Sequence, residues 1–317
     1  MCLSAIRRWL FISDLGRRRD SKGLDMNRRL IITADDYGMC ETVNQAIEVC
    51  LAVGTVRATC VMTNMPAFRT TESLRRKFPQ SSLGIHWTLT EGRPVLPLAQ
   101  VPSLVRPDGT FYSAVQLRQR WRQRCVNATE MQAELRAQYQ RFCTVADQPD
   151  FWNTHQNFHV FPGLFDVCVA LGQALHIPAM RCHRRFTVPY TQTPITYHMH
   201  HPLPWLKGKV ISWWARRAER QGMLMPDGVV HIPDYEANHT VITEAVRHLP
   251  WDTVPHAVEL IVHPATTSQE ALFHMHPERR VLEYRVFTAP QLAKRLDQLG
   301  IETVGFEVLH HSSNSYS

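Results

Sequence analysis

The sequence predicts one α/β domain built on a parallel sheet that is either open or closed into a barrel. Short apolar segments rich in branched residues alternate with longer segments in which apolar residues recur at helical spacing. This alternation is typical of βαβ units. The length of 317 residues and the hydrophobic fraction of 44% are enough for one large core.

The first unit starts with an apolar strand over 30–34, which suits burial on both faces of a sheet. A helix follows over 41–53, and Gly54 stands where a helix C-cap is expected. In the strand over 83–90, His86 alternates with Leu83, Ile85 and Trp87 and therefore faces the other side. The other expected strands cover 55–63, 151–155, 177–182, 257–263 and 301–306, and the other helices cover 68–78, 113–124, 129–145, 164–175 and 290–299.

The amino-terminal end of the chain differs in charge from its body. Residues 1–27 are predicted to be a disordered basic tail, and 28–317 a single catalytic domain. Residues 1–29 carry +5 of the formal charge of +7 and leave +2 on the body, so the sequence does not favour a nucleic-acid partner. No apolar run approaches the roughly 18 residues of a membrane-spanning helix.

The eight cysteines are scattered, form no C-x-x-C pair and mostly have apolar neighbours. Buried free thiols show this pattern, which favours a reducing, cytoplasmic location.

Four groups of polar residues stand at expected strand ends: Asp35 with Asp36, His86, His155 with His159, and His263. The carboxyl ends of parallel strands meet at one edge, where reactive groups collect. Two imidazoles and one carboxylate are a common ligand set for a catalytic divalent ion. Asp36, His86 and His155 would supply this set, and Asp35 could accept a proton beside it.

Each motif also has an ordinary structural interpretation. Asp-Asp-Tyr-Gly is typical of a turn, and a single strand histidine is more often structural than a ligand. The i, i+4 spacing of His155 and His159 is a known ligand pattern. With 17 histidines in the chain some coincidence is expected, and His198–His201 in a proline-rich segment is predicted to be solvated.

Taken together, four segments resemble the motifs of the YdjC-like carbohydrate deacetylases in order and approximate spacing. They are Thr33-Ala-Asp-Asp-Tyr-Gly38, Gly84-Ile-His-Trp-Thr-Leu-Thr90, Asn153-Thr-His-Gln-Asn-Phe-His159 and Val262-His-Pro-Ala265. The resemblance runs from about Arg28 to Phe306. It implies a deformed (β/α) barrel, similar to a TIM barrel, that removes an N-acetyl group from an amino sugar.

The resemblance also implies roles for particular residues. Asp35 is expected to be the general base and His263 the general acid. Asp36, His86 and His155 are expected to bind one divalent ion, with zinc favoured and magnesium second. His159 and Arg181 are expected to contact or support the substrate.

Asn153 stands where chitooligosaccharide-type members carry an aspartate, and the hopanoid-associated branch is more similar here and over Glu91–Pro97. The substrate is therefore open between an oligosaccharide and a lipid-linked N-acetylhexosamine, such as a lipid A or hopanoid-pathway intermediate.

Residues 202–221 mix Trp205, Trp213 and Trp214 with five lysines and arginines. Such a segment can lie at a membrane interface, which would place the protein at the inner face of the membrane. A lid or core helix is the alternative interpretation. A homodimer is left open.

Two other functions share parts of this pattern. A non-haem Fe(II) oxygenase also uses two histidines and a carboxylate, but such sites usually lie in all-β jelly rolls. A catalytically silent carbohydrate-binding protein could keep the pocket, although it would have no use for Asp35 as a base.

Overall fold

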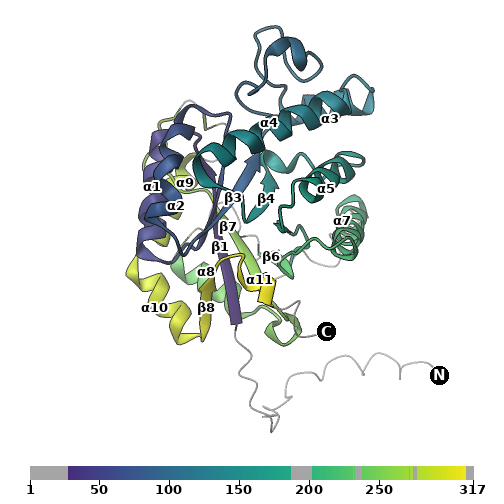
Figure 1. Cartoon of the computed structure of the whole chain (residues 1–317). Helices are drawn as coiled ribbons and strands as arrows, with labels where there is room; N and C mark the ends of the chain where they lie inside the picture. The colour runs from purple at the N-terminus through teal and green to yellow at the C-terminus, as the bar shows by residue number, and fades with distance from the viewer. Residues whose placement is uncertain are drawn as a thin grey trace, which may run out of the picture.

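The computed structural model describes residues 28–186, 202–230, 232, 238–270, 272–273 and 277–311. Within these residues eight parallel strands form one sheet, in the order β5-β4-β3-β2-β1-β7-β6, with β8 paired to β1. Helices surround the sheet (Figure 1). The strands are β1 (Arg28–Tyr37), β2 (Ala58–Val61), β3 (Ser82–Trp87), β4 (Phe151–Thr154), β5 (Ala179–Met180), β6 (Gly228–Val230), β7 (Val258–Val262) and β8 (Ile301–Val304).

Strand β1 is the centre of the sheet. One of its edges pairs with β7 over Leu30–Ala34. Because a strand has two edges, β8 and β2 share the other, β8 along the first four residues and β2 from Thr33 onward. The last eight residues of β1 are buried, as the apolar run predicted.

The two ends of the sheet meet. Strand β5 lies at one end of the order and β6 at the other. Two isolated parallel bridges connect each of these strands to a residue near the other, Ala179 of β5 to Leu224 and Val229 of β6 to Arg185. The sheet therefore curls into a deformed (β/α) barrel, which confirms the predicted fold class.

The helices largely follow the periodicity of the sequence. Helix α1 covers the predicted 41–53, and Gly54 ends it with a left-handed φ of 82°. The expected helix over 68–78 is instead a 3₁₀ segment, η1 (Pro66–Ser73), and the single turn α2. The α-helices are α1 (Glu41–Val53), α2 (Leu74–Lys77), α3 (Ala114–Arg122), α4 (Ala128–Ala146), α5 (Leu164–Ala174), α7 (Pro202–Arg220), α8 (His239–Arg247), α9 (Pro277–Phe287), α10 (Pro290–Gln298) and α11 (Val308–His311), and the other 3₁₀ segments are η2 (Leu98–Gln100), η3 (His155–Asn157) and η5 (Trp251–Thr253).

Helix α7 occupies most of the aromatic and basic segment 202–221, whereas the periodicity of the sequence did not predict α8, α9 or β6. The predicted tail over 1–27 and the histidines at 198 to 201 lie outside the described residues. None of the helices in the described part combines the length and apolarity needed to cross a bilayer.

The two largest apolar clusters pack against the sheet. The larger one fills the space between strands and helices and includes Trp87 and Trp152, whose rings lie 5.1 Å apart. The smaller one includes the stacked rings of Phe151 and Phe306, 3.8 Å apart. A Cβ on Gly84 would lie 2.6 Å from the Phe151 ring, so this close packing requires glycine. The smaller cluster closes the amino end of the barrel interior.

Candidate metal and acid–base centre

Strand alternation places the reactive residues inside the barrel. Residues two apart on a strand lie on the same face of the sheet. The apolar residues of the smaller cluster therefore lie on the same face as polar residues further along the same strands. Ile31 precedes Thr33 and Asp35 in this way, and Phe151 precedes Asn153. The polar residues on this face are Thr33, Asp35, His86, Asn153, Arg181 and Glu259, and each has at most 3% of its surface exposed.

Asp36 breaks this alternation. An extended backbone would point Asp35 and Asp36 to opposite faces, but Asp36 has a left-handed φ of 74°. The pairing of β1 with β2 also shifts between Ala34 and Tyr37. The two carboxylates therefore lie in neighbouring hydrogen-bond networks of one site. Aspartate is one of the few non-glycine residues that tolerate this conformation.

Asp36, His86 and His155 converge on one point. The Asp36 Oδ1 atom lies 3.1 Å from His155 Nδ1 and 3.3 Å from His86 Nε2, and the two ring nitrogens are 3.3 Å apart. All three residues are buried, and they form a candidate metal-binding group. One carboxylate and two imidazoles suit a divalent ion that keeps open positions for water and substrate.

Cys60 is a second potential ligand, because Asp35, Cys60 and His86 also lie within reach of one ion. Burial, and then the neighbouring Asp35, raises the pKa of the Cys60 thiol well above its usual value. The thiol donates to Asp35 Oδ1 at 3.1 Å. Cys60 was not among the predicted ligands, whereas Asp36, His86 and His155 are the predicted set.

The Asn153 amide lies between His86 and Arg181, and each end of the amide can face only one of them. With Oδ1 toward His86, Nδ1–H of the imidazole donates and Nε2 keeps the lone pair that a metal needs. With Oδ1 toward Arg181, at 2.7 and 3.0 Å from its terminal nitrogens, the amide donates to Nδ1 and the ring proton moves to Nε2. Metal binding requires the first orientation.

Arg280 holds the other oxygen of Asp36. Its Nη2 donates to Asp36 Oδ2 at 2.6 Å, and its guanidinium lies 4.5 Å above the Phe273 ring. Burial raises the pKa of Asp36, but Arg280 and His155 together lower it by more, so the pKa is well below its usual value. Sequence reasoning missed Arg280, because it stands among several charged residues on α9 and belongs to no motif.

Asp35 has a separate cation. Arg181 Nη1 and Nη2 donate to its two carboxylate oxygens at 2.6 and 2.7 Å. Burial raises the pKa of Asp35, but the Arg181 charge and hydrogen bonds lower it more, and the net pKa lies well below the usual value. Glu259 accepts from Arg181 Nε at 3.0 Å and from Thr33 at 2.8 Å. An acidic residue on the inward face of the apolar strand β7 is a signal that could have identified Glu259.

His263 lies beside Asp35, with 3.9 Å between Nε2 and Asp35 Oδ2. Its backbone N–H donates to the buried Glu283 at 2.5 Å. Burial lowers the pKa of His263, and Asp36, Asp35 and Glu283 offset part of this shift. Because 41% of the side chain is exposed, water moderates the shift, and among the predicted acid–base residues His263 is the one that reaches solvent.

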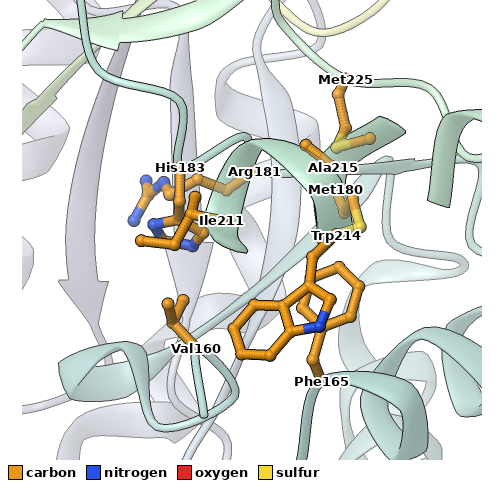
Figure 2. A pocket seen from close by; sticks show the side chains of 9 residues that line it. All are labelled: Val160, Phe165, Met180, Arg181, His183, Ile211, Trp214, Ala215 and Met225. Atoms are coloured by element: carbon orange, nitrogen blue, oxygen red, sulfur yellow. The ribbon is translucent and has the colours of Figure 1, made fainter. Parts of the chain in front are cut away.

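His159 and Arg181 lie behind these groups, with 0% and 2% of their surface exposed. Figure 2 shows Arg181 and His183 at one end of a small pocket whose other end is formed by Met180, Trp214 and Met225. Burial lowers the pKa of His159 to about 3. Direct substrate contact by His159 and Arg181 stays a prediction, and their burial favours supporting roles.

Comparison with known proteins gives consistent matches. A family model described as YdjC-like protein matches residues 29–298. A carbohydrate deacetylase of Geobacillus stearothermophilus is 34% identical over 170 residues, which are 51% of this chain and 65% of that relative. A carbohydrate deacetylase of Brevibacillus brevis is 25% identical over 284 residues, covering 89% of this chain and 99% of the relative.

The fold has a solved counterpart in Enterococcus faecalis, a protein whose name gives cellobiose-phosphate cleavage as a proposed role. The TM-score is 0.68 at 24% identity, over 89% of this chain and 99% of the other. The match to the Geobacillus relative spans slightly less than two thirds of that protein. The family model, in contrast, covers most of the present chain, and the chain belongs to the YdjC-like protein family.

Proposed function

We propose that this protein is a metal-dependent hydrolase that removes the N-acetyl group from an amino sugar. The observation that carries the proposal is the convergence of Asp36, His86 and His155 beside a second, separately held carboxylate, Asp35. A metal site alone has no need of this neighbour, whereas amide hydrolysis needs a base next to the ion. The names of the two deacetylase relatives support the same reaction.

Asp36, His86 and His155 would hold the ion, which polarises the amide carbonyl and lowers the pKa of a bound water. Asp35 is proposed to accept the proton of the attacking water. Arg181 fixes both oxygens of Asp35 and so sets the direction of its free lone pairs. The ion pair with Arg181 lowers the pKa of Asp35, so the carboxylate is ionised at neutral pH and carries no proton of its own when the water attacks.

His263 is proposed to protonate the leaving amine as the amide C–N bond breaks. Acetate and the free amino sugar are then the products. The partial exposure of His263 suits this role, because the sugar must enter from solvent and its nitrogen must reach the imidazole. The 3.9 Å separation from Asp35 keeps acid and base on the same reacting amide.

Zinc is the favoured ion and magnesium the second choice. Two imidazoles with one carboxylate suit zinc, whereas magnesium prefers a set of oxygen ligands. We propose that the protein is cytoplasmic and that its substrate is an oligosaccharide or a lipid-linked N-acetylhexosamine. A homodimer is compatible with this proposal. A silent carbohydrate-binding protein is the alternative, and turnover separates the two.

The test is acetate release from N-acetylglucosamine, chitobiose and polyprenyl-phosphate N-acetylglucosamine by protein stripped with a chelator and reloaded with zinc or magnesium. Metal-dependent release from at least one substrate is expected. Sugar binding by the reloaded protein without any acetate release would refute the proposal in favour of the silent binder.

A further inference from the structure

Helices α3 and α7 carry the two most exposed of the large apolar side chains in the described residues. Val115 on α3 is 73% exposed, and Trp213 on α7 is 52% exposed. Each stands seven residues before an exposed arginine, Arg122 and Arg220, and this spacing places both side chains on one face of a helix. Trp214, in contrast, is buried and stacks on Phe165, so α7 has a core face and a solvent face.

The solvent faces of these helices are basic. Among the described residues, no carboxylate lies within 4.0 Å of Arg122, Arg124, Arg216 or Arg220, although Arg217 pairs with Asp166 and Glu219 with Arg184. The chain has no acidic residue from 109 to 129. The positive potential of this side is therefore only partly neutralised within the described protein.

The first turn of α5 and Pro162 just before it together contact both helices. Trp121, at the end of α3, donates to the Pro162 carbonyl at 3.0 Å, next to the start of α5. Asp166 of α5 then binds Arg217 of α7 at 2.8 Å. Figure 1 shows α3, α5 and α7 along the same side of the barrel. We call the exposed residues Val115, Arg122, Arg124, Val210, Trp213, Arg216 and Arg220 the basic face.

A cavity of about 530 Å³ opens beside the basic face. Its lining includes Arg122 and Arg124 together with Trp121 and Phe161. Phe161 lies six residues after His155, a distance of at most about 20 Å along an extended chain. Guanidinium groups bind phosphate through paired hydrogen bonds, so the cavity can take an anionic lipid headgroup within reach of the site.

From these observations we infer that the basic face binds the surface of an anionic lipid bilayer. Cationic helices with exposed tryptophan and aliphatic side chains lie at such interfaces, where the apolar side chains enter the headgroup region and the arginines meet anionic lipids. The inference deepens the proposed function, since a bilayer-bound enzyme would meet a lipid-linked amino sugar.

The test is flotation of the full chain with phosphatidylcholine vesicles, with and without phosphatidylglycerol. Binding is expected only to vesicles that contain phosphatidylglycerol, and it should weaken as salt is added. Arg122→Glu with Arg220→Glu should lower the partition coefficient at least about tenfold, because each cation contributes about fivefold near such a surface. Trp213→Ser should lower it several-fold.

Matched controls lie on the other side of the barrel. Arg247→Glu with Lys294→Glu makes the same charge change on α8 and α10, and Leu282→Ser removes a 39% exposed apolar side chain from α9. These variants should bind as the parent does. Equal loss in both sets, unchanged binding after Arg122 and Arg220 are reversed, or no binding to anionic vesicles would overturn the inference. Acetate release from chitobiose should be unchanged in all of these variants. The membrane inference can therefore be overturned without affecting the deacetylase proposal, and the reverse also holds.

Discussion

Asp35 and Asp36 are neighbours in sequence, yet their hydrogen-bond partners differ. Asp35 lies on the regular inward face of β1, where a guanidinium from the end of β5 binds both of its oxygens. Asp36 has a left-handed backbone and divides its oxygens between two imidazoles and a guanidinium from α9. One irregular residue thus gives two identical side chains two different chemistries.

The largest expected difference between the two carboxylates is in metal binding. Asp36→Asn, His86→Ala and His155→Ala should lose both the ion and turnover. Asp35→Asn should keep the ion and lose turnover by about 10²–10⁴-fold, the usual contribution of a general base. Metal content by mass spectrometry after dialysis, beside acetate release, checks this. Retained metal in the histidine variants would show that the ligand assignment is wrong.

Replacing Arg280 or Arg181 should likewise affect either metal binding or turnover, and by less than replacing the carboxylates. Arg280→Met frees one oxygen of Asp36 and should weaken metal affinity about 10–100-fold, as loss of a group that orients a ligand does. Arg181→Met should leave metal affinity nearly unchanged and lower kcat. Calorimetric titration with zinc alone provides the comparison, and equal effects on zinc affinity would contradict the division described above.

Asn153→Asp sharpens the comparison, because a carboxylate accepts from both His86 and Arg181 and removes the conflict over the amide orientation. Zinc affinity should rise by up to about tenfold, since the correct His86 tautomer is then fixed. Asn153→Ala is the control and should lower the affinity. A weaker affinity in the aspartate variant would show that its added charge matters more than the tautomer.

The smallest expected effect concerns stability behind the site. Because burial lowers the pKa of His159 from 6.5 to about 3, the unfolded chain takes up a proton on acidification before the folded protein does. The stability is complete above pH 6.5 and falls as the pH drops toward 3, by about 2 kcal/mol between pH 6.5 and pH 5. His159→Gln should remove this part of the loss, which urea unfolding at the two pH values measures. Equal losses in parent and variant would contradict it.

Strand residues were the most predictable part of the site. The alternation of residues along β3 was enough to predict that His86 faces away from Leu83, Ile85 and Trp87, and the structure places this face inside the barrel. That Asp36 shares the site was also an expectation from the strand-to-loop turn. The seven strands expected from the sequence all have counterparts in the sheet.

Contacts made across the chain could not be predicted in this way. Arg280 meets Asp36 from 244 residues away, and only the packing of α9 against the barrel decides that. The two isolated bridges that close the sheet each pair single residues, and no sequence pattern marks such residues. Segment 68–78 shows a local limit, because its apolar spacing fits an α-helix while its backbone forms mostly 3₁₀ turns.

The φ of 74° at Asp36 also restricts which ligands this position can offer. Asparagine, aspartate and histidine adopt a left-handed backbone more readily than other non-glycine residues, glutamate included. Asp36→Glu would therefore keep the charge but strain the backbone, while Asp36→His would present a third imidazole in a backbone that accepts it. The single substitution Asp36→His is thus a starting point for redesigning the site toward an ion that prefers three histidine ligands.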